Sequence, residues 1–278
     1  MADNLPSLHS PPSEALEAVD RILQDVLRQY GYQPRRLAQV LRLMAMLLPT
    51  VRPEAIAALV LQSMWVYAVD ALVDGFAPDL DTRFRRWLEH PLEPNPDDAE
   101  HRLFAAMWSH VRSLGTPQGC ERWQQALEVF LSAQLREHTP PQSYLDYLDV
   151  RVIANGLPSL AALAALLQGE LGALDTARTA NLVRWGGIFT SLANDLHSYD
   201  RELAEGTAAT ANALGVLMGL AARQGGVLDL VSARGIVQAD CDAALHMFDA
   251  QLGGSSQWSA LDGFIARAVG LVRHGHVV

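Results

Sequence analysis

The sequence predicts an all-α protein, a single-domain bundle of about ten to twelve helices. Apolar residues recur at helical spacing over most of the chain, and no alternating strand pattern flanked by hairpin turns interrupts them. Proline and glycine divide the chain into segments of roughly 12 to 28 residues, each long enough for one helix. Half of the residues are hydrophobic and 19% are charged, so the chain can build a large core.

The elements follow in order from the N-terminus. Residues 1–12 hold three prolines and two serines and are expected to form a disordered leader, so the folded domain is expected to span residues 13–278. Apolar stripes from Ala15 to Leu27 and from Leu37 to Leu48 predict the first two helices.

A third helix is expected in the apolar segment 55–76. Its most apolar part, Ala55–Val69, has 15 residues and contains Gln62 and Ser63. A membrane-spanning helix needs about 20 apolar residues, so no membrane span is expected. The chain also begins without the basic and apolar regions of a signal peptide, which favours a cytoplasmic location.

Charge and composition exclude several functions. The 31 acidic and 21 basic residues give a net charge of −10, so the basic face that binds nucleic acid is not expected. All 21 basic residues are arginine, which excludes a P-loop lysine and a Schiff-base lysine. The two cysteines, Cys120 and Cys241, lack the spacing of a zinc site.

Two carboxylates stand out in the third expected helix. Asp70 and Asp74 are four residues apart and therefore share one helix face. Like charges at this spacing repel, and an apolar helix would have to desolvate them, so a divalent cation with oxygen ligands is one explanation. The other explanation is that the pair marks the end of a core helix, which Gly75 and Pro78 stop.

A second set of oxygen donors lies in the segment 194–202, on a helix expected at about residues 177 to 204. Asn194, Ser198 and Glu202 fall at i, i+4 and i+8, in line on one face. An amide oxygen, a hydroxyl and a carboxylate are ligands that suit magnesium. A solvated helix end explains the same polar residues.

Together, the two motifs resemble those of the bacterial class I terpene synthases, over essentially the whole chain. The second metal motif of that family, N-D-x-x-S-x-x-x-E, is matched at every position by Asn194, Asp195, Ser198 and Glu202. The resemblance implies the class I terpenoid synthase fold for this chain.

The first metal motif of the family, D-D-x-x-D, is matched in part. Asp70 and Asp74 stand at its first and last aspartates, 124 residues before Asn194, and Ala71 stands where the second aspartate usually is. The resemblance implies metal-binding roles for Asp70 and Asp74, with Asp70 at the position that generally ligates metal in this family.

The resemblance also implies roles for four further residues. Arg151 corresponds to a diphosphate-sensing arginine, and the backbone carbonyl of Asn155 to the group that helps trigger ionisation, at a helix break in Asn155-Gly-Leu-Pro. Arg273 corresponds to the arginine of an Arg-Tyr pair that binds diphosphate. His274 replaces the tyrosine of that pair.

The activity that the resemblance implies is magnesium-assisted loss of diphosphate from a prenyl diphosphate, followed by cyclisation of the carbocation to a terpene hydrocarbon or alcohol. Three Mg²⁺ ions are implied, two held from the Asp70 side and one by Asn194, Ser198 and Glu202. The implied partner is the small-molecule substrate, and a homodimer is compatible with the sequence.

The length of the substrate is less constrained. The segment EGTAATANAL, residues 205–214, resembles a stretch of bacterial labdane-type diterpene cyclases, which favours a C20 diphosphate slightly over C15 farnesyl diphosphate. A prenyl diphosphate synthase is disfavoured because a second D-D-x-x-D and lysines are missing. A degenerate, non-catalytic helical bundle, inactivated at Ala71, is the alternative from another functional class.

Overall fold

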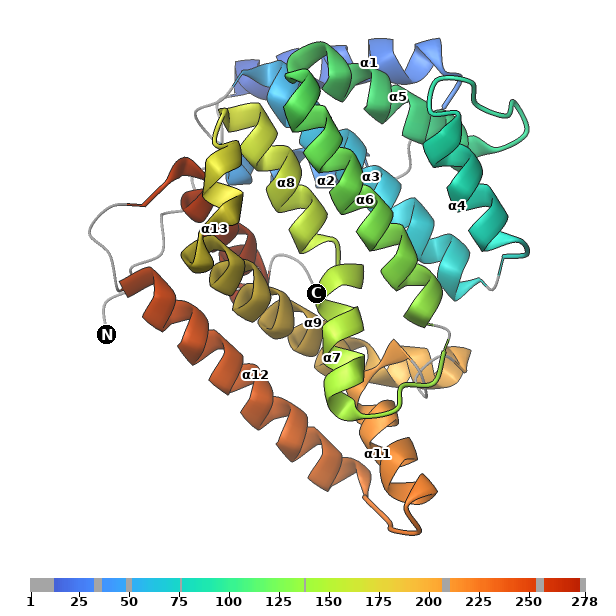
Figure 1. The fold of residues 1–278 in the computed structure, drawn as a ribbon, viewed down its shortest axis with the longest axis vertical. Coiled ribbons are helices and arrows are strands. Elements are labelled where there is room, and N and C mark those ends of the chain that lie inside the picture. The colour runs from blue at the N-terminus through green and yellow to red at the C-terminus, as the bar shows by residue number, and fades with distance from the viewer. Residues whose placement is uncertain are drawn as a thin grey trace. The chain divides into compact units, whose positions relative to one another are not determined.

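The computed structural model describes residues 13–32, 37–48, 52–75, 77–137, 139–206, 211–253 and 258–275. These residues form twelve α-helices and one short 3-10 helix, Leu171–Asp175, with no strand among them (Figure 1). The all-α class and the number of helices expected from the sequence are therefore confirmed. The expected leader, residues 1–12, lies outside the described residues.

The described residues fall into two compact units. The N-terminal unit holds residues 13–128 and 159–174, and the C-terminal unit holds residues 129–158 and 175–275. Two helices pass from one unit into the other, α6 (Pro117–Glu137) and α8 (Leu157–Gln168). A single domain over residues 13–278 stays a prediction.

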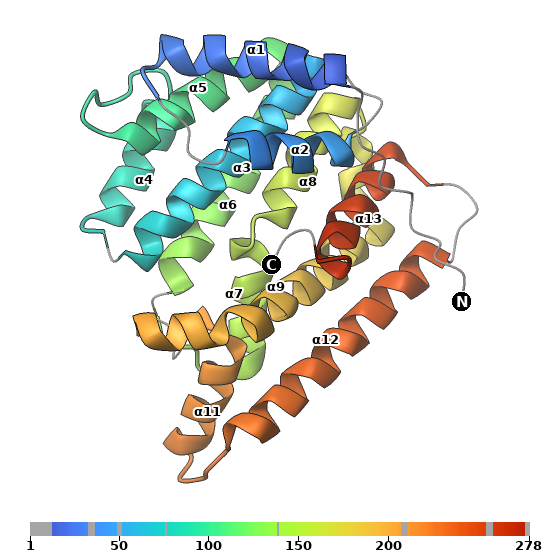
Figure 2. The same ribbon diagram turned by 180° about the vertical axis from the view of Figure 1, so that it is seen from behind.

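The N-terminal unit is built around one central helix. Its helices are α1 (Ser13–Gln29), α2 (Leu37–Leu47), α3 (Pro53–Asp74), α4 (Leu80–Glu89) and α5 (Ala99–Leu114). α1, α2 and α5 all pack against α3 (Figures 1 and 2). Residues 55–65 of α3 are buried without exception, which explains why the helix is apolar on every face.

Buried aromatic and amide groups fix α3 in this core. The ring centroids of Trp65 and Phe104, the latter on α5, lie 5.1 Å apart. Gln62 is fully buried, accepts a hydrogen bond from Trp123 Nε1 at 2.8 Å and donates one to Ser159 Oγ at 3.0 Å. The amide that interrupts the apolar stretch is thus satisfied inside the core.

Two helical stretches are long and apolar enough to cross a membrane by length and composition alone, Pro53–Asp74 and Tyr144–Gln168. The first is longer than the apolar stretch seen in the sequence because α3 continues through the turn that carries Asp70 and Asp74. In their most apolar windows, 67% and 61% of the residues are buried within the protein, as in core helices.

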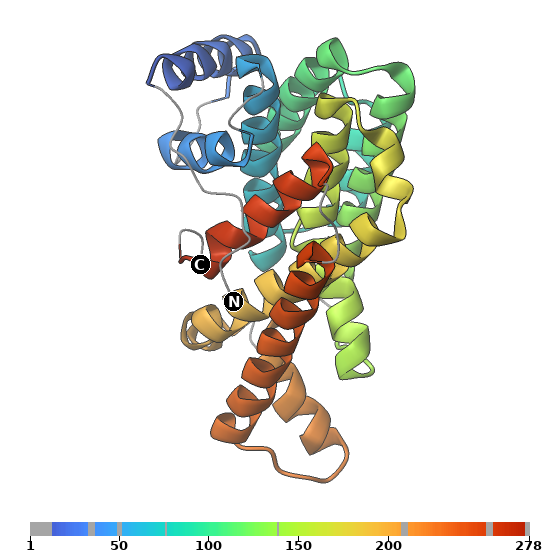
Figure 3. The same cartoon turned by 90° about the vertical axis from the view of Figure 1, so that its left-hand side faces the viewer.

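The C-terminal unit is organised around α9. Its helices are α7 (Tyr144–Ala154), α9 (Ala177–Glu205), α11 (Ala213–Arg223), α12 (Leu230–Gly253) and α13 (Ala260–Arg273). The other four pack against α9, and α12 lies beside it in Figures 1 and 2 and crosses it in the view of Figure 3. The Thr176 side chain caps the start of α9 by accepting from Thr179 N at 3.1 Å, and Gly206 ends it at φ 83°. The helix expected at about 177–204 is confirmed.

Two consecutive glycines set how closely helices approach α9. A Cβ at Gly186 would lie 2.7 Å from Val269 Cγ2 of α13, and a Cβ at Gly187 would lie 2.9 Å from Val152 Cγ1 of α7. Close-packed interiors do not accommodate such contacts without a shift. Gly187 therefore fixes the distance between α9 and the helix that carries Arg151.

Candidate active site

The end of α9 brings the three oxygen donors of the second motif onto one face. Asn194 is half-buried, whereas Ser198 and Glu202 are buried, at 4% and 8% exposure. The Ser198 hydroxyl donates to the Asn194 carbonyl at 2.8 Å, which holds its oxygen against the helix. A carboxylate so little exposed needs compensation by hydrogen bonds or by a cation.

The Glu202 carboxylate is held at both oxygens. Oε2 accepts a hydrogen bond from Asn212 Nδ2 at 2.9 Å, and Arg201 Nη2 lies 3.5 Å from Oε1. Asn212 itself is fully buried at the start of α11. The Glu202 side chain is thus oriented by Arg201 on α9 and by Asn212 at the start of α11.

The donor set fits a hard cation. No group of three His, Cys, Asp or Glu side chains suited to a metal occurs among the residues that the structure describes. The set on α9 has one carboxylate, one amide and one hydroxyl, all oxygen donors. Magnesium prefers such ligands, binds few protein carboxylates and takes further oxygens from phosphate, whereas zinc favours histidine and cysteine.

The Asp195 side chain contacts α7 and the start of α11. It is fully buried and accepts hydrogen bonds at Oδ2 from the Tyr147 hydroxyl and, at 3.2 Å, from the backbone N–H of Ala213. Arg151 Nη2 lies 3.0 Å from its Oδ1. Burial raises the pKa of Asp195, although the Arg151 guanidinium and the Tyr147 hydroxyl act in the opposite direction.

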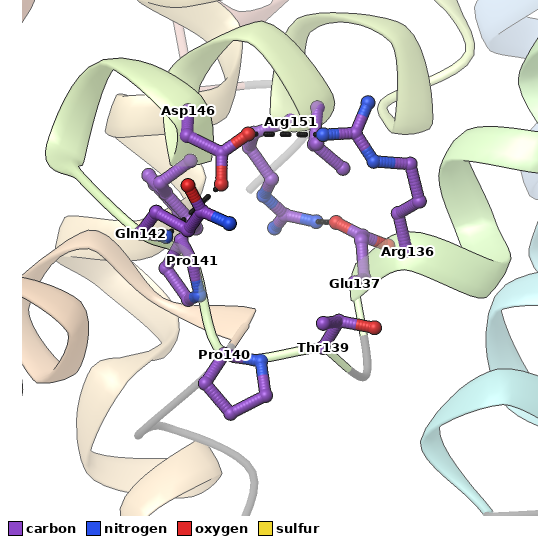
Figure 4. A pocket seen from close by; sticks show the side chains of 10 residues that line it. Arg136, Glu137, Thr139, Pro140, Pro141, Gln142, Asp146 and Arg151 are labelled. Carbon is purple, nitrogen blue, oxygen red and sulfur yellow. Dashed lines mark hydrogen bonds and ion pairs between the residues drawn. The ribbon is translucent and has the colours of Figure 1, made fainter.

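Arg151 joins three elements through its guanidinium. Nη2 pairs with Asp195 of α9, and Nη1 lies 2.9 Å from Glu137 Oε1 at the end of α6. The pair with Glu137 forms part of the wall of a cavity of about 330 Å³ between the end of α6, the segment 139–142 and α7 (Figure 4). The predicted diphosphate-sensing arginine is therefore held by two carboxylates in this structure.

Two of these partners were missed by sequence reasoning. Tyr147 lies four residues before Arg151, so its position on the same face of α7 follows from helical spacing. Glu137 lies 14 residues before Arg151 on another helix, and no local pattern indicates it.

The expected helix break lies at Asn155. α7 ends at Ala154, Gly156 adopts a φ of 80°, and α8 begins at Leu157. The Asn155 side chain donates to Gly187 O at 3.0 Å and to Ser191 Oγ at 2.9 Å on α9. The break is confirmed, and the Asn155 amide ties it to α9. The role of its backbone carbonyl stays a prediction.

Arg273 and His274 lie at the far end of α13 and are exposed. Arg273 Nη1 lies 3.4 Å from both carboxylate oxygens of Asp249 on α12. His274 is the C-cap residue of α13, and its N–H donates to the Gly270 carbonyl. Their contacts with diphosphate stay predictions.

Asp70 and Asp74 occupy the last turn of α3, in the N-terminal unit. Asp70 is half-buried, Asp74 is exposed, and α3 ends at Asp74 with Gly75 as its C-cap. Acidic groups at the C-terminal end of a helix oppose its dipole, and two carboxylates four residues apart repel each other. The metal-binding roles of Asp70 and Asp74 stay predictions. Ala71, between them, is exposed.

The chain resembles a known family in sequence and solved structures in fold. Residues 63–246, which contain both candidate metal motifs, match the family described as "Terpene synthase family 2, C-terminal metal binding". No curated protein matches the sequence.

Three solved structures share the fold over nearly their whole length. Hedycaryol synthase is 20% identical, with 98% of this chain and 97% of that chain covered and a TM-score of 0.68. Linalool/nerolidol synthase from Streptomyces clavuligerus is 18% identical, with 99% of each chain covered and a TM-score of 0.72. For 2-methylisoborneol synthase from Streptomyces coelicolor A3(2) the identity is 17%, the coverage 98% and 93%, and the TM-score 0.71.

Proposed function

The chain belongs to terpene synthase family 2, which makes it a magnesium-dependent lyase of prenyl diphosphates, and we propose that its substrate is farnesyl diphosphate. The proposed reaction is loss of diphosphate to give an allylic cation, which cyclises to a C15 hydrocarbon or alcohol. The observation that carries this proposal is the line of oxygen donors on α9, with buried Glu202 at its end.

The proposed roles divide between the two units. Asn194, Ser198 and Glu202 hold one metal ion, and Asp70 with Asp74 on α3 hold two more. When bound, magnesium neutralises the negative charge that develops on the departing diphosphate.

The arginines supply fixed donors for the same charge. Arg151 presents a planar guanidinium that binds an oxyanion through two parallel N–H groups, which the ammonium of lysine cannot do. In this structure Nη1 pairs with Glu137 and Nη2 with Asp195, so a bound diphosphate would share or replace these two carboxylate partners. Arg273 and His274 are proposed to contact the diphosphate, and the Asn155 carbonyl to face the developing cation.

The proposed substrate is C15 because the segment 205–214, which favoured a C20 substrate in the sequence, has another explanation. The residues Asn212 and Ala213 of the labdane-type stretch contact Glu202 and Asp195, so they serve the metal motif. Among proteins of the same fold, hedycaryol synthase was solved with nerolidol, linalool/nerolidol synthase with 2-fluorogeranyl diphosphate, and 2-methylisoborneol synthase with Mg²⁺ and 2-fluoroneryl diphosphate. These are C10 and C15 compounds, which favours farnesyl diphosphate over a C20 substrate.

The test is incubation of the purified chain with geranyl, farnesyl, geranylgeranyl or copalyl diphosphate, each with magnesium or with EDTA. Extracts are analysed by gas chromatography and mass spectrometry. A magnesium-dependent C15 product from farnesyl diphosphate supports the proposal, and a C20 product would restore the longer substrate. No product from any substrate, with folded protein, would favour the non-catalytic bundle.

A further inference from the structure

Asn212 makes more contacts than the capping of α11 requires. It is fully buried, and its Oδ1 accepts from Leu214 N at 3.0 Å, as an N-cap side chain does. Its Nδ2 group donates twice, to the Asp195 carbonyl at 2.8 Å and to Glu202 Oε2 at 2.9 Å. Both amide protons and the amide oxygen are therefore in use.

The two donated bonds explain why this position holds asparagine. Aspartate or serine would cap α11 equally well, since each offers an acceptor for the Leu214 N–H. Neither can cap the helix and donate to two acceptors at the same time, which only a side-chain amide does. Aspartate would moreover set a second buried carboxylate against Glu202.

We propose that Asn212 is a positioning residue of the metal site, because its amide fixes the orientation in which the Glu202 carboxylate binds magnesium. The proposal rests on the proposed function, in which Glu202 is a metal ligand. Asn212 engages Oε2, and Arg201 Nη2 lies beside Oε1, so the amide fixes one of the two carboxylate oxygens. It also ties that orientation to the start of α11, because the same side chain caps that helix.

The expected consequence is a loss of metal affinity. Removal of a group that hydrogen-bonds to a metal ligand and orients it typically weakens metal affinity by about 10- to 100-fold. The turnover number at saturating magnesium should change much less, because Glu202 itself is still present. A merely structural role would lower thermal stability and leave the magnesium dependence unchanged.

The experiment compares Asn212→Ser and Asn212→Asp with the wild type. Both keep an acceptor for α11. Aspartate has no proton to donate to Glu202 and keeps the volume of asparagine, whereas serine offers one hydroxyl proton on a shorter side chain in place of the two amide protons. Binding of Mg²⁺ in the presence of inorganic diphosphate is measured by titration calorimetry, and Mn²⁺ binding by electron paramagnetic resonance, so that neither readout depends on turnover.

Ser259→Ala is the matched control. Ser259 caps α13 in the same unit by accepting from Asp262 N at 2.9 Å, in a capping box formed with Asp262, whereas Asn212 caps α11. This variant should lose stability as a missing cap does, while its metal affinity stays within about twofold of the wild type.

The outcomes separate this inference from the proposed function. Metal affinity at least about 10-fold weaker in both Asn212 variants, but not in Ser259→Ala, supports the positioning role. Wild-type affinity in both Asn212 variants, with binding lost in Glu202→Gln, overturns it and leaves the function intact. Wild-type binding in Glu202→Gln would instead overturn the assignment of Glu202 as a ligand.

Discussion

Two glutamates on the last turn of α9 differ in their surroundings. Glu202 is buried and hydrogen-bonded to Asn212, whereas Glu205, three residues later, is exposed. Burial of a carboxylate is costly, and an ordinary helix end does not require it. The contrast is the reason to assign the metal to Glu202 rather than to the acidic end of the helix in general.

Glu202→Gln should therefore lower kcat by about 100-fold or more, the scale for losing one preorganised electrostatic group. The substitution keeps the size of the side chain and an oxygen acceptor for Asn212 but removes the charge. Glu205→Gln, on the same turn, should leave kcat within about twofold, because it is solvated. Steady-state kinetics at limiting magnesium test this expectation. Wild-type turnover of Glu202→Gln under those conditions would contradict the assignment of Glu202 as a metal ligand.

The two aspartates of α3 should differ in the same assay. Asp70 is half-buried and is a proposed metal ligand, so Asp70→Asn should lower kcat by about 100-fold. Asp74 is exposed at the end of the helix, and Asp74→Asn should have a milder effect. Complete loss of activity in Asp74→Asn would show that Asp74 contributes as much to metal binding as Asp70 and compensates for the missing aspartate at Ala71.

At the scale of elements, the contact between α7 and α9 determines where Arg151 and Asn155 lie. Gly187→Ala should lower the free energy of unfolding by about 1–3 kcal/mol, because its Cβ would meet Val152 Cγ1. It should also lower kcat, since α7 must shift with its arginine. Thermal unfolding and kinetics at a temperature where the variant is folded measure both effects.

Gly235→Ala is the control for that substitution. Gly235 is exposed on α12, and nothing lies within 4 Å of a Cβ built there. Alanine should stabilise this helix by up to about 1 kcal/mol and leave kcat unchanged. A Gly187→Ala enzyme with unchanged stability and turnover would show that the α7–α9 distance is not critical.

The elements themselves were predictable because their causes are local. Apolar spacing located α9, and the Asn155-Gly-Leu-Pro sequence located the break between α7 and α8. The three donors on α9 follow from helical spacing in the same way.

The surroundings of these donors were not predictable, because they depend on how helices pack. Asp195 meets Tyr147 and Arg151 on a helix more than 40 residues away in sequence, and no local rule sets that pairing. Asn212 resembled a signal for substrate length in the sequence, yet its contacts are with Glu202 and Asp195. The role of a polar side chain is thus clear only when its partners are known.

At the scale of the whole molecule, the proposed function assigns metal ligands to both units, with Asp70 and Asp74 in one and Asn194, Ser198 and Glu202 in the other. A ligand that binds only the folded chain raises its stability by mass action. Magnesium and inorganic diphosphate added together should therefore raise the unfolding temperature, by an amount equivalent to about 2.7 kcal/mol at 100 times the dissociation constant. EDTA should remove the effect, and either component alone should give less of it.

The same rise in unfolding temperature distinguishes a joint role of the two motifs from a role of α9 alone. If both sets of ligands hold metal for one diphosphate, Asp70→Asn and Glu202→Gln should each reduce the shift, although the substitutions lie in different units. Glu205→Gln should retain it in full. A full shift in Asp70→Asn, with none in Glu202→Gln, would confine metal-assisted diphosphate binding to the C-terminal unit. The chemistry would then depend on α9 and Arg151, and the acidic end of α3 would have lost its part in it along with the aspartate missing at Ala71.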